Sequence, residues 1–310
     1  MKKISILIPC LNEEGNVPLI TQKIEEIFEN ELSEYDYELI FIDNYSTDCT
    51  RDIIRVLCSK NSRIKAIFNT KNFGPSRSPV YGLTQTGGDC AIMIPADLQV
   101  PPELIPQFVA KWEGGHRIVI AQKSTSKENP LMFFCRKVYY KLFNVIGDIE
   151  HIEHFAGFGL YDKKFIELLS SLEEPEPYIR GLVTEFESDW DIIEFTEPKR
   201  QSGHTKTNFF SLYDTAMLGF TSYSKAIPRY ATLIGFVISA VCIVIAIVFL
   251  VLKLVFWQNY PMGYAPILIS VFGLSGIQLF FLGLLGEYIM RINTRVSKRP
   301  LVTEEERINF

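Results

Sequence analysis

Two long stretches without a charged residue near the C-terminus constrain this chain more than any other feature. No residue from Ala231 to Leu252 carries a charge, and a second uncharged run extends from Met262 to Gly286. A helix of about 20 apolar residues crosses a bilayer, and two adjacent helices of this kind are rare in the core of a soluble chain of 310 residues. We therefore expect residues 230–290 to form two transmembrane helices, at about 231–252 and 262–287, joined by a short external loop.

Basic residues beside the two runs predict their orientation. These residues are Lys225 and Arg229 before the first run and Arg291, Arg295, Lys298 and Arg299 after the second, whereas the loop at 257–261 is uncharged. Loops rich in Lys and Arg stay on the cytoplasmic side. The sequence thus predicts a multi-pass protein of the cell inner (plasma) membrane, with its N-terminal domain in the cytoplasm and residues 291–310 as a cytoplasmic tail.

Residues 206–229, directly before the first run, are rich in aromatic and aliphatic side chains and poor in charge. This pattern is typical of an amphipathic helix that lies in the membrane interface. An amphipathic helix packed on the soluble domain is the alternative. We favour the interface because the first predicted span follows within a few residues.

Composition narrows the class of protein further. The net charge is −5 and no long run of one sign occurs, so we expect no nucleic-acid partner. The six cysteines form no C-x-x-C pair and no cluster with histidine, which favours reduced thiols over a zinc site or a disulfide framework. The apolar stretch Ile4–Ile8 is too short for a signal peptide, so we interpret it as a strand.

Strand-like and helix-like segments alternate over about the first 125 residues. The expected strands are Lys3–Ile8, Tyr37–Ile42, Arg63–Phe68 and Cys90–Ile94, and the expected helices are Val17–Phe28, Thr50–Ser59 and about 78–86. Further on we expect a helix at Met132–Ile146, a strand at Phe158–Tyr161, a helix from Tyr178 and a strand at Trp190–Phe195. The alternation indicates an α/β domain over residues 1–205, with a mostly parallel sheet flanked by helices.

Acidic and amide side chains follow three of these strands. The first strand ends in Pro9–Glu14, the second in Asp43–Asp48, and the fourth in Asp97 and Gln99. The carboxyl ends of parallel strands meet at one edge of a sheet, where the ligands of such sheets bind. Capping of the helices that follow is the alternative for each cluster, but three clusters at one edge favour a binding site.

Asp97 and Gln99 are separated by one residue, so in an extended segment their side chains point to the same side. Two such oxygens suit Mg²⁺, which often takes one or two carboxylates and completes its shell with phosphate oxygens and water. A cap on the helix opened by Pro101 and Pro102 is the alternative role for Asp97.

Six short motifs occur in order along the chain: IPCLNEE, FIDNYSTD, NFG, ADLQVPPEL, RGL and RQSGHTK. Followed by the two uncharged runs, this set resembles the family-two inverting glycosyltransferases. It is most similar to the polyisoprenyl-phosphate glycosyltransferases, the bacterial relatives of dolichol-phosphate mannose synthase, over essentially the whole chain. The resemblance implies a GT-A fold, a nucleotide-sugar donor with UDP mildly preferred, a polyprenyl (undecaprenyl) phosphate acceptor at the membrane, and a homo-oligomer.

The same resemblance assigns roles to individual residues. The side chains that would bind the nucleotide sugar are Pro9, Leu11, Glu13, Asp43, Lys123 and Arg136. The residues that would act in catalysis are Asp97, Arg200 and Lys206. Asp97 and Gln99 would hold Mg²⁺ or Mn²⁺ on the diphosphate. A solvated surface charge is the alternative for each of the four basic residues.

Three positions depart from the family pattern. Pro95 replaces the first acid of Asp-Ala-Asp, and Asn44 stands where a second acid is common. Gly157 occupies the place of an Asp that is a proposed base in relatives. A hydroxyl acceptor needs a base, whereas a phosphate monoester has a second pKa of about 6 and is largely dianionic at neutral pH. The missing base therefore fits a phosphate acceptor better than a sugar acceptor.

Two other functions compete with this interpretation. A processive polysaccharide synthase resembles the same family but carries a Gln-x-x-Arg-Trp motif, which is absent from this sequence. A catalytically silent relative that binds nucleotide or lipid as a scaffold is the other alternative, and the three departures keep it open. Turnover of a donor separates the scaffold from the enzyme.

Overall fold

The computed structural model describes residues 1–123, 152, 155–172, 174–196, 264–296 and 299–310, together with positions 233, 237, 241, 244, 251 and 255. Several predictions lie outside these residues. They are the helix at Met132–Ile146, the interfacial helix at 206–229, most of the first membrane span, and the site residues Arg136, Arg200 and Lys206.

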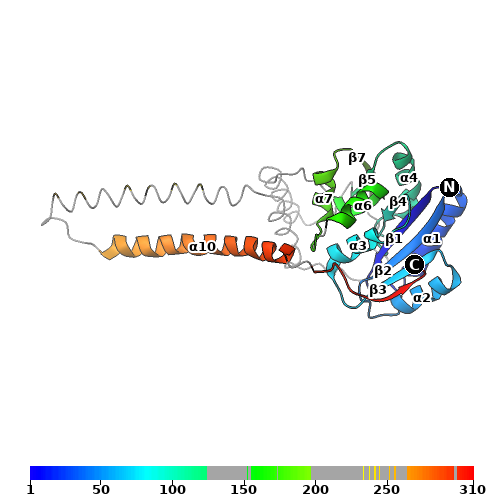
Figure 1. The fold of residues 1–310 in the computed structure, drawn as a ribbon, viewed down its shortest axis with the longest axis horizontal. Helices are drawn as coiled ribbons and strands as arrows, with labels where there is room; N and C mark the ends of the chain where they lie inside the picture. The colour runs from blue at the N-terminus through cyan, green and yellow to red at the C-terminus, as the bar shows by residue number, and fades with distance from the viewer. Residues whose placement is uncertain are drawn as a thin grey trace.

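An eight-stranded sheet forms the centre of the domain (Figure 1). Its strands lie in the order β7-β5-β6-β4-β1-β2-β3-β8. The strands are β1 (Lys3–Cys10), β2 (Asp36–Asp43), β3 (Ile64–Asn69), β4 (Cys90–Met93), β5 (Ile118–Lys123), β6 (Phe155–Asp162), β7 (Trp190–Phe195) and β8 (Glu304–Ile308). Only β6 and β8 run against the common direction of the other strands, which confirms the predicted α/β domain with a mostly parallel sheet.

Helices cover both faces of the sheet. On one face lie α1 (Val17–Asn30), α2 (Thr50–Lys60) and α4 (Ile105–Glu113), the last preceded by a 3₁₀ turn at Pro102–Leu104. On the other face lie α3 (Gly74–Thr84), α6 (Lys163–Ser171) and α7 (Ile179–Phe186). The result is a three-layer arrangement of helices, sheet and helices.

The sequence of β1 explains its central position. Ile4, Ile6 and Ile8 pack on the α1/α2/α4 side, and Leu7 packs on the opposite side. All four side chains are fully buried, and burying an aliphatic side chain contributes roughly 1.5–3 kcal/mol. A continuous apolar run is therefore favourable only where helices cover both faces, as they do here.

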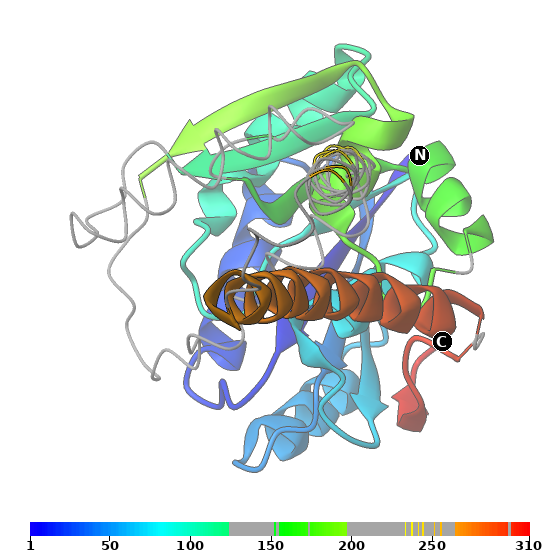
Figure 2. The ribbon, with the colours of Figure 1, turned by 90° about the vertical axis from the view of Figure 1, so that its left-hand side faces the viewer.

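The C-terminal part of the chain differs from the expected tail. Helix α10 (Tyr264–Val296) continues beyond the expected end of the second span, and residues 304–308 form strand β8. Figure 1 shows α10 projecting from the domain and the chain returning to the sheet at β8, and Figure 2 views the domain from the side on which α10 projects. Counting only the side chains that the structure describes, no helix is long and apolar enough to cross a membrane.

Candidate active site

The loop after β1 and the loop after β2 are joined by hydrogen bonds at the carboxyl edge of the sheet. The backbone N–H of Asn12 donates to Oγ of Ser46 at 2.8 Å, and the N–H of Thr47 donates to Oδ1 of Asn12 at 2.7 Å. Asn12 adopts a φ of 58°, a left-handed conformation that asparagine tolerates better than most residues. Its side chain therefore connects two loops and does not cap α1, whose N-cap is Asn16.

Two glutamates extend this connection. The N–H of Glu13 donates to Oγ1 of Thr50 at 2.8 Å, and Oε2 of Glu14 accepts from the N–H of Cys49 at 2.9 Å. The Glu13 side chain is buried and accepts from Nδ2 of Asn16 at 2.6 Å. Asp48 accepts from the N–H of Thr50 at 3.1 Å, but the N-cap of α2 is Cys49, so neither Asn12 nor Asp48 is the N-cap of the helix that follows it.

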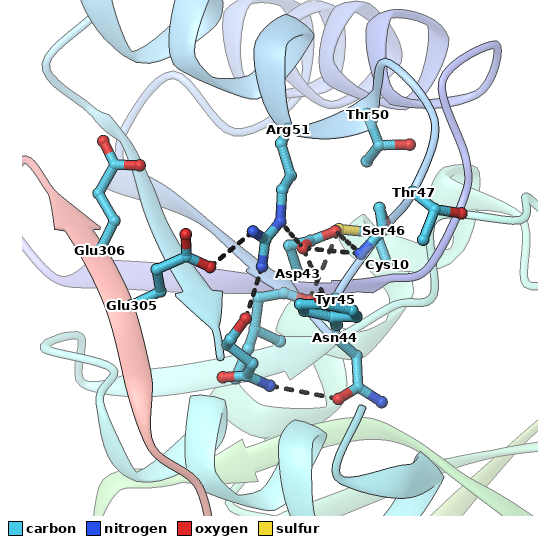
Figure 3. A network of polar contacts seen from close by, with 12 residues as sticks. Cys10, Asp43, Asn44, Tyr45, Ser46, Thr47, Thr50, Arg51, Glu305 and Glu306 are labelled. Atoms are coloured by element: carbon cyan, nitrogen blue, oxygen red, sulfur yellow. Dashed lines mark hydrogen bonds and ion pairs between the residues drawn. The ribbon is translucent and has the colours of Figure 1, made fainter. Parts of the chain in front are cut away.

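Asp43, the last residue of β2, is fully buried. Figure 3 shows the polar groups around its carboxylate. Its carboxylate accepts from the N–H groups of Tyr45 at 3.1 Å and Ser46 at 3.0 Å, and from Nε of Arg51 at 2.6 Å. Burial, reinforced by the charge of Asp43, raises the pKa of the neighbouring Cys10 thiol well above its usual value. In this conformation Asp43 organises the β2–α2 loop, and a ligand would meet the loop before it met the carboxylate.

Asn44 explains one departure from the family pattern. Its Nδ2 donates to Oδ1 of Asn72 at 2.9 Å and to the carbonyl of Gly74 at 3.1 Å. Its Oδ1 accepts from the N–H of Phe73 at 2.9 Å and from Nδ2 of Asn69. A carboxylate could accept the last two bonds but could not donate the first two. The amide thus ties the β3–α3 loop to the end of β2.

The expected extended geometry at Asp97 and Gln99 is wrong. Leu98 has a φ of 57° and is buried, and Oδ1 of Asp97 accepts from the N–H of Gln99 at 3.1 Å. This is an Asx turn, in which an aspartate folds back on its own backbone. The simple alternation of sides fails because burial of Leu98 turns the chain. Both polar residues remain half-buried at the same edge of the sheet.

Gly157 lies in β6 with a φ of 89°. A Cβ atom there would approach Cγ2 of Ile179 to 2.9 Å, and the carbonyl of Gly157 accepts from the hydroxyl of Tyr161 at 2.8 Å. Backbone conformation and packing on α7 both favour glycine at this position. The nearby Asp162 caps α6 by accepting from the N–H of Lys164, and it also accepts from the indole of Trp112.

The other predicted site residues that the structure describes, Pro9, Leu11 and Lys123, lie at the same edge. Pro9 lies near the end of β1, and its carbonyl accepts from the N–H of Ala96 at 3.1 Å, which ties the β4 loop to β1. Leu11 follows β1 and Lys123 ends β5, both half-buried. The structure thus brings together Pro9, Leu11, Glu13, Asp43, Asp97, Gln99 and Lys123 at the carboxyl edge.

Arg51 is a site residue that the sequence analysis missed. It stands eight residues after Asp43 in the first turn of α2 and donates to the Asp43 carboxylate, a contact that no local sequence pattern indicates. In the part of the chain that the structure describes, no three His, Cys, Asp or Glu side chains converge to hold a metal ion.

Residues 5–169 match the family model described as glycosyl transferase family 2. This chain belongs to that family. The predictions of a GT-A fold and of a glycosyltransferase are thereby confirmed.

Three relatives match this family-two glycosyltransferase over almost its whole length. The prophage bactoprenol glucosyl transferase homolog of Escherichia coli K12 is 33% identical over 96% of this chain and 97% of that protein. The bactoprenol glucosyl transferase of Shigella phage SfX is 32% identical over the same shares. The putative glycosyltransferase CsbB of Bacillus subtilis is 32% identical over 96% of this chain and 89% of that protein.

One solved structure is weakly similar to this chain. Glucosyl-3-phosphoglycerate synthase from Mycobacterium tuberculosis, crystallised with Mn²⁺, uridine diphosphate and phosphoglyceric acid, is 19% identical. The match covers 71% of this chain and 76% of that chain, with a TM-score of 0.48.

Proposed function

We propose that this glycosyltransferase moves a sugar from a nucleotide-diphosphate sugar to a polyprenyl phosphate at the cytoplasmic face of the membrane. The observation that carries the proposal is the near full-length similarity to two proteins named bactoprenol glucosyl transferase. A chain that matches them over 96% of its length includes the segments that surround the catalytic domain as well as the domain itself.

The donor would bind where the loops after β1, β2, β3 and β4 meet. Hydrogen bonds between these loops fix their backbones before a ligand arrives, and preorganisation of this kind lowers the entropic cost of binding. Pro9, Leu11 and Glu13 would frame the nucleotide, and the loop held by Asp43 would recognise its base or ribose. Uridine diphosphate is the nucleotide we favour.

A divalent cation, Mg²⁺ or Mn²⁺, would complete the donor site. The donor set fits such an ion. Asp97 supplies a half-buried carboxylate and Gln99 an amide in one turn, and a magnesium site needs only one or two carboxylates when diphosphate and water supply the other ligands. When bound, the ion supplies positive charge that stabilises the diphosphate leaving group.

The reaction would be a direct displacement with inversion. An oxygen of the lipid phosphate attacks the anomeric carbon, the bond from that carbon to the diphosphate oxygen breaks, and nucleoside diphosphate leaves. Lys123, Arg136, Arg200 and Lys206 would bind phosphates of donor and acceptor, because Arg and Lys stabilise developing negative charge. No base is needed, since the acceptor is already an anion at neutral pH, and glycine at position 157 is compatible with this.

The acceptor implies a membrane. We propose that the uncharged runs at 231–252 and 262–287 span the inner membrane, with 206–229 at the interface and both chain ends in the cytoplasm. Large apolar side chains of α10 support this, because Val271, Leu282 and Leu285 are each more than half exposed. Side chains of this type favour lipid over water.

The decisive experiment supplies membranes that contain the protein with undecaprenyl phosphate and a panel of radiolabelled nucleotide sugars. We expect label in the lipid fraction with one donor of the panel. Transfer of label to a long polysaccharide would favour a processive synthase. Binding of nucleotide without transfer to any lipid would favour a catalytically silent scaffold.

A further inference from the structure

A chain of charged side chains links the last strand, β8, to the end of β2 (Figure 3). Nε of Arg51 donates to Asp43 at 2.6 Å, and Nη1 of Arg51 donates to Oε2 of Glu305 at 2.8 Å. The remaining nitrogen, Nη2, donates to the backbone carbonyl of Asn69 at 2.5 Å. Each guanidinium nitrogen thus contacts a different strand, namely β2, β8 and β3.

The three charged groups differ in burial. The Asp43 side chain is fully buried, that of Arg51 is 14% exposed, and that of Glu305 is 51% exposed. A buried carboxylate without a partner is strongly unfavourable, so Asp43 depends on Arg51. The half-exposed pair with Glu305 adds little attraction of its own. Its effect is to fix the planar fork of the guanidinium, whose donors must all be aligned together.

Asp43 passes this constraint on to the loop that follows β2. Its carboxylate accepts from the N–H groups of Tyr45 and Ser46, and Tyr45 is held at a φ of 73°. The ring of Tyr45 lies under the Arg51 guanidinium, 5.3 Å from ring centroid to Cζ, and is 45% exposed. Arg51 therefore touches this loop both through Asp43 and through Tyr45.

Strand β8 is anchored independently of Glu305. It pairs antiparallel with β3 from Ala66↔Ile308 to Asn69↔Glu304. The hydroxyl of Tyr81 donates to Glu304 at 2.8 Å, and Nδ2 of Asn309 donates to the carbonyls of Cys58 and Ile64. Loss of the Glu305 carboxylate should therefore leave β8 in its place.

We propose that Arg51 is a positioning residue for the nucleotide half of the donor, and that Glu305, 254 residues further along the chain, holds Arg51 in place. The proposal rests on the proposed function, because it takes the β2–α2 loop as the nucleotide subsite. It makes the strand after α10 a part of the donor site. It predicts that changes in this strand alter donor affinity and leave the chemical step unchanged.

The neighbouring ion pair provides a matched control. Arg55 donates to Oε2 of Glu306 through Nε at 3.0 Å and Nη2 at 2.8 Å, and it also donates to Asp52 in its own helix. This pair joins the same helix to the same strand. Within the described residues Arg55 makes no hydrogen bond to Asp43, so Glu306→Gln removes a comparable pair without changing the loop.

The experiment compares full-length parent, Glu305→Gln, Glu306→Gln and Arg51→Lys in detergent micelles, with UDP and GDP each titrated by calorimetry. For the nucleotide that binds the parent, Glu305→Gln should weaken affinity about fivefold. Arg51→Lys should weaken it about tenfold, because lysine keeps the charge and loses the fork. Glu306→Gln should stay within about twofold of the parent. Thermal unfolding of each variant checks folding.

Transfer kinetics provide the second measurement. Glu305→Gln should raise the donor KM about fivefold with kcat unchanged. Equal affinities for Glu305→Gln, Glu306→Gln and the parent would overturn this inference and leave the proposed function intact. If the parent bound neither UDP nor GDP, the β2–α2 loop would not be a nucleotide subsite. That result would overturn both this inference and the proposed function.

Discussion

The side-chain amide of Asn44 donates to Oδ1 of Asn72 across 2.9 Å, so the end of β2 is fastened to the turn that opens α3. Asn44 is nearly buried, and its donor side faces two acceptors, Asn72 and the carbonyl of Gly74. The residue that departs from the family pattern is therefore one that this chain needs for the shape of the site.

Asn44→Asp should destabilise the protein. The new carboxylate would face two acceptors and lose two donated hydrogen bonds, at a cost of about 1–3 kcal/mol of unfolding free energy. Thermal unfolding in detergent measures the loss. Asn72→Asp is the matched control, because its Oδ1 only accepts, from Asn44 and from the N–H of Gly74. Equal melting temperatures for the two variants would contradict this account.

Asp97→Asn should abolish activity without unfolding the site. The amide keeps an Oδ1 that can accept from the N–H of Gln99, so the turn survives while the negative charge is lost. We expect transfer to fall about 100-fold or more and the melting temperature to stay within a few degrees of the parent. Measured rates across a Mg²⁺ titration test the assignment. Unchanged activity would remove Asp97 from the metal site.

Glu38, near the opposite end of β2, should make the stability of the protein sensitive to acid. Burial alone would raise its pKa, but hydrogen bonds from Lys3, Ser5, Lys65 and Gly87 outweigh burial and lower the pKa to about 2. Its folded pKa lies below the unfolded value of 4.5. The stabilisation is therefore complete above about pH 4.5 and is lost as the pH falls toward 2. The shift corresponds to about 3 kcal/mol of unfolding free energy.

Glu38→Gln tests this contribution. The variant should melt lower than the parent at pH 7, and the difference should shrink as the pH is lowered below 4.5. Glu113→Gln is the control, since Glu113 also pairs with a lysine but is 37% exposed, and exposed pairs contribute about 0–1 kcal/mol. A pH-independent difference for Glu38→Gln would contradict the prediction.

Truncation after Arg229 should yield a domain that is prone to aggregation. A chain cut there lacks β8, which leaves the edge of β3 unpaired, and open edges favour aggregation. Joining residues 299–310 to the truncated domain through a flexible Gly–Ser linker should restore a monodisperse species and raise its melting temperature. Size-exclusion chromatography and thermal unfolding measure both effects.

A proline within the joined strand is the control for that fusion. Glu306→Pro removes a backbone donor from the strand, and proline is poorly tolerated in paired strands. This fusion should behave as the plain truncation does. If residues 1–229 alone proved as stable and monodisperse as the intact fusion, β8 would be dispensable for the domain.

The sequence by itself determined the layered core. Isoleucine-rich runs alternating with amphipathic segments predicted β1 to β4 and helices α1 to α3. A strand buried on both faces is a continuous apolar run, whereas a helix buried on one face has apolar residues at every third or fourth position. It also brought Asp43 and Asp97 to one edge, since the carboxyl ends of parallel strands coincide there. Strand β5 and helix α6 were not predicted, because a short apolar run without clear turn or cap residues beside it fits a strand and a helix equally well.

Only the tertiary structure decided what those edge residues contact. Burial of Leu98 turned the Asp97 segment away from the extended form, and Arg51 became visible as a site residue only when β2, β3 and β8 met around it. The charged run Glu304–Arg307 was expected to be a tail, because nothing local favours a strand there. It forms a strand because it pairs with the edge of β3, which lies more than 230 residues earlier in the chain. A hydrogen bond from Thr70 to the carbonyl of Thr303 joins the same two segments. Local pattern carries no information about an edge that forms so far away.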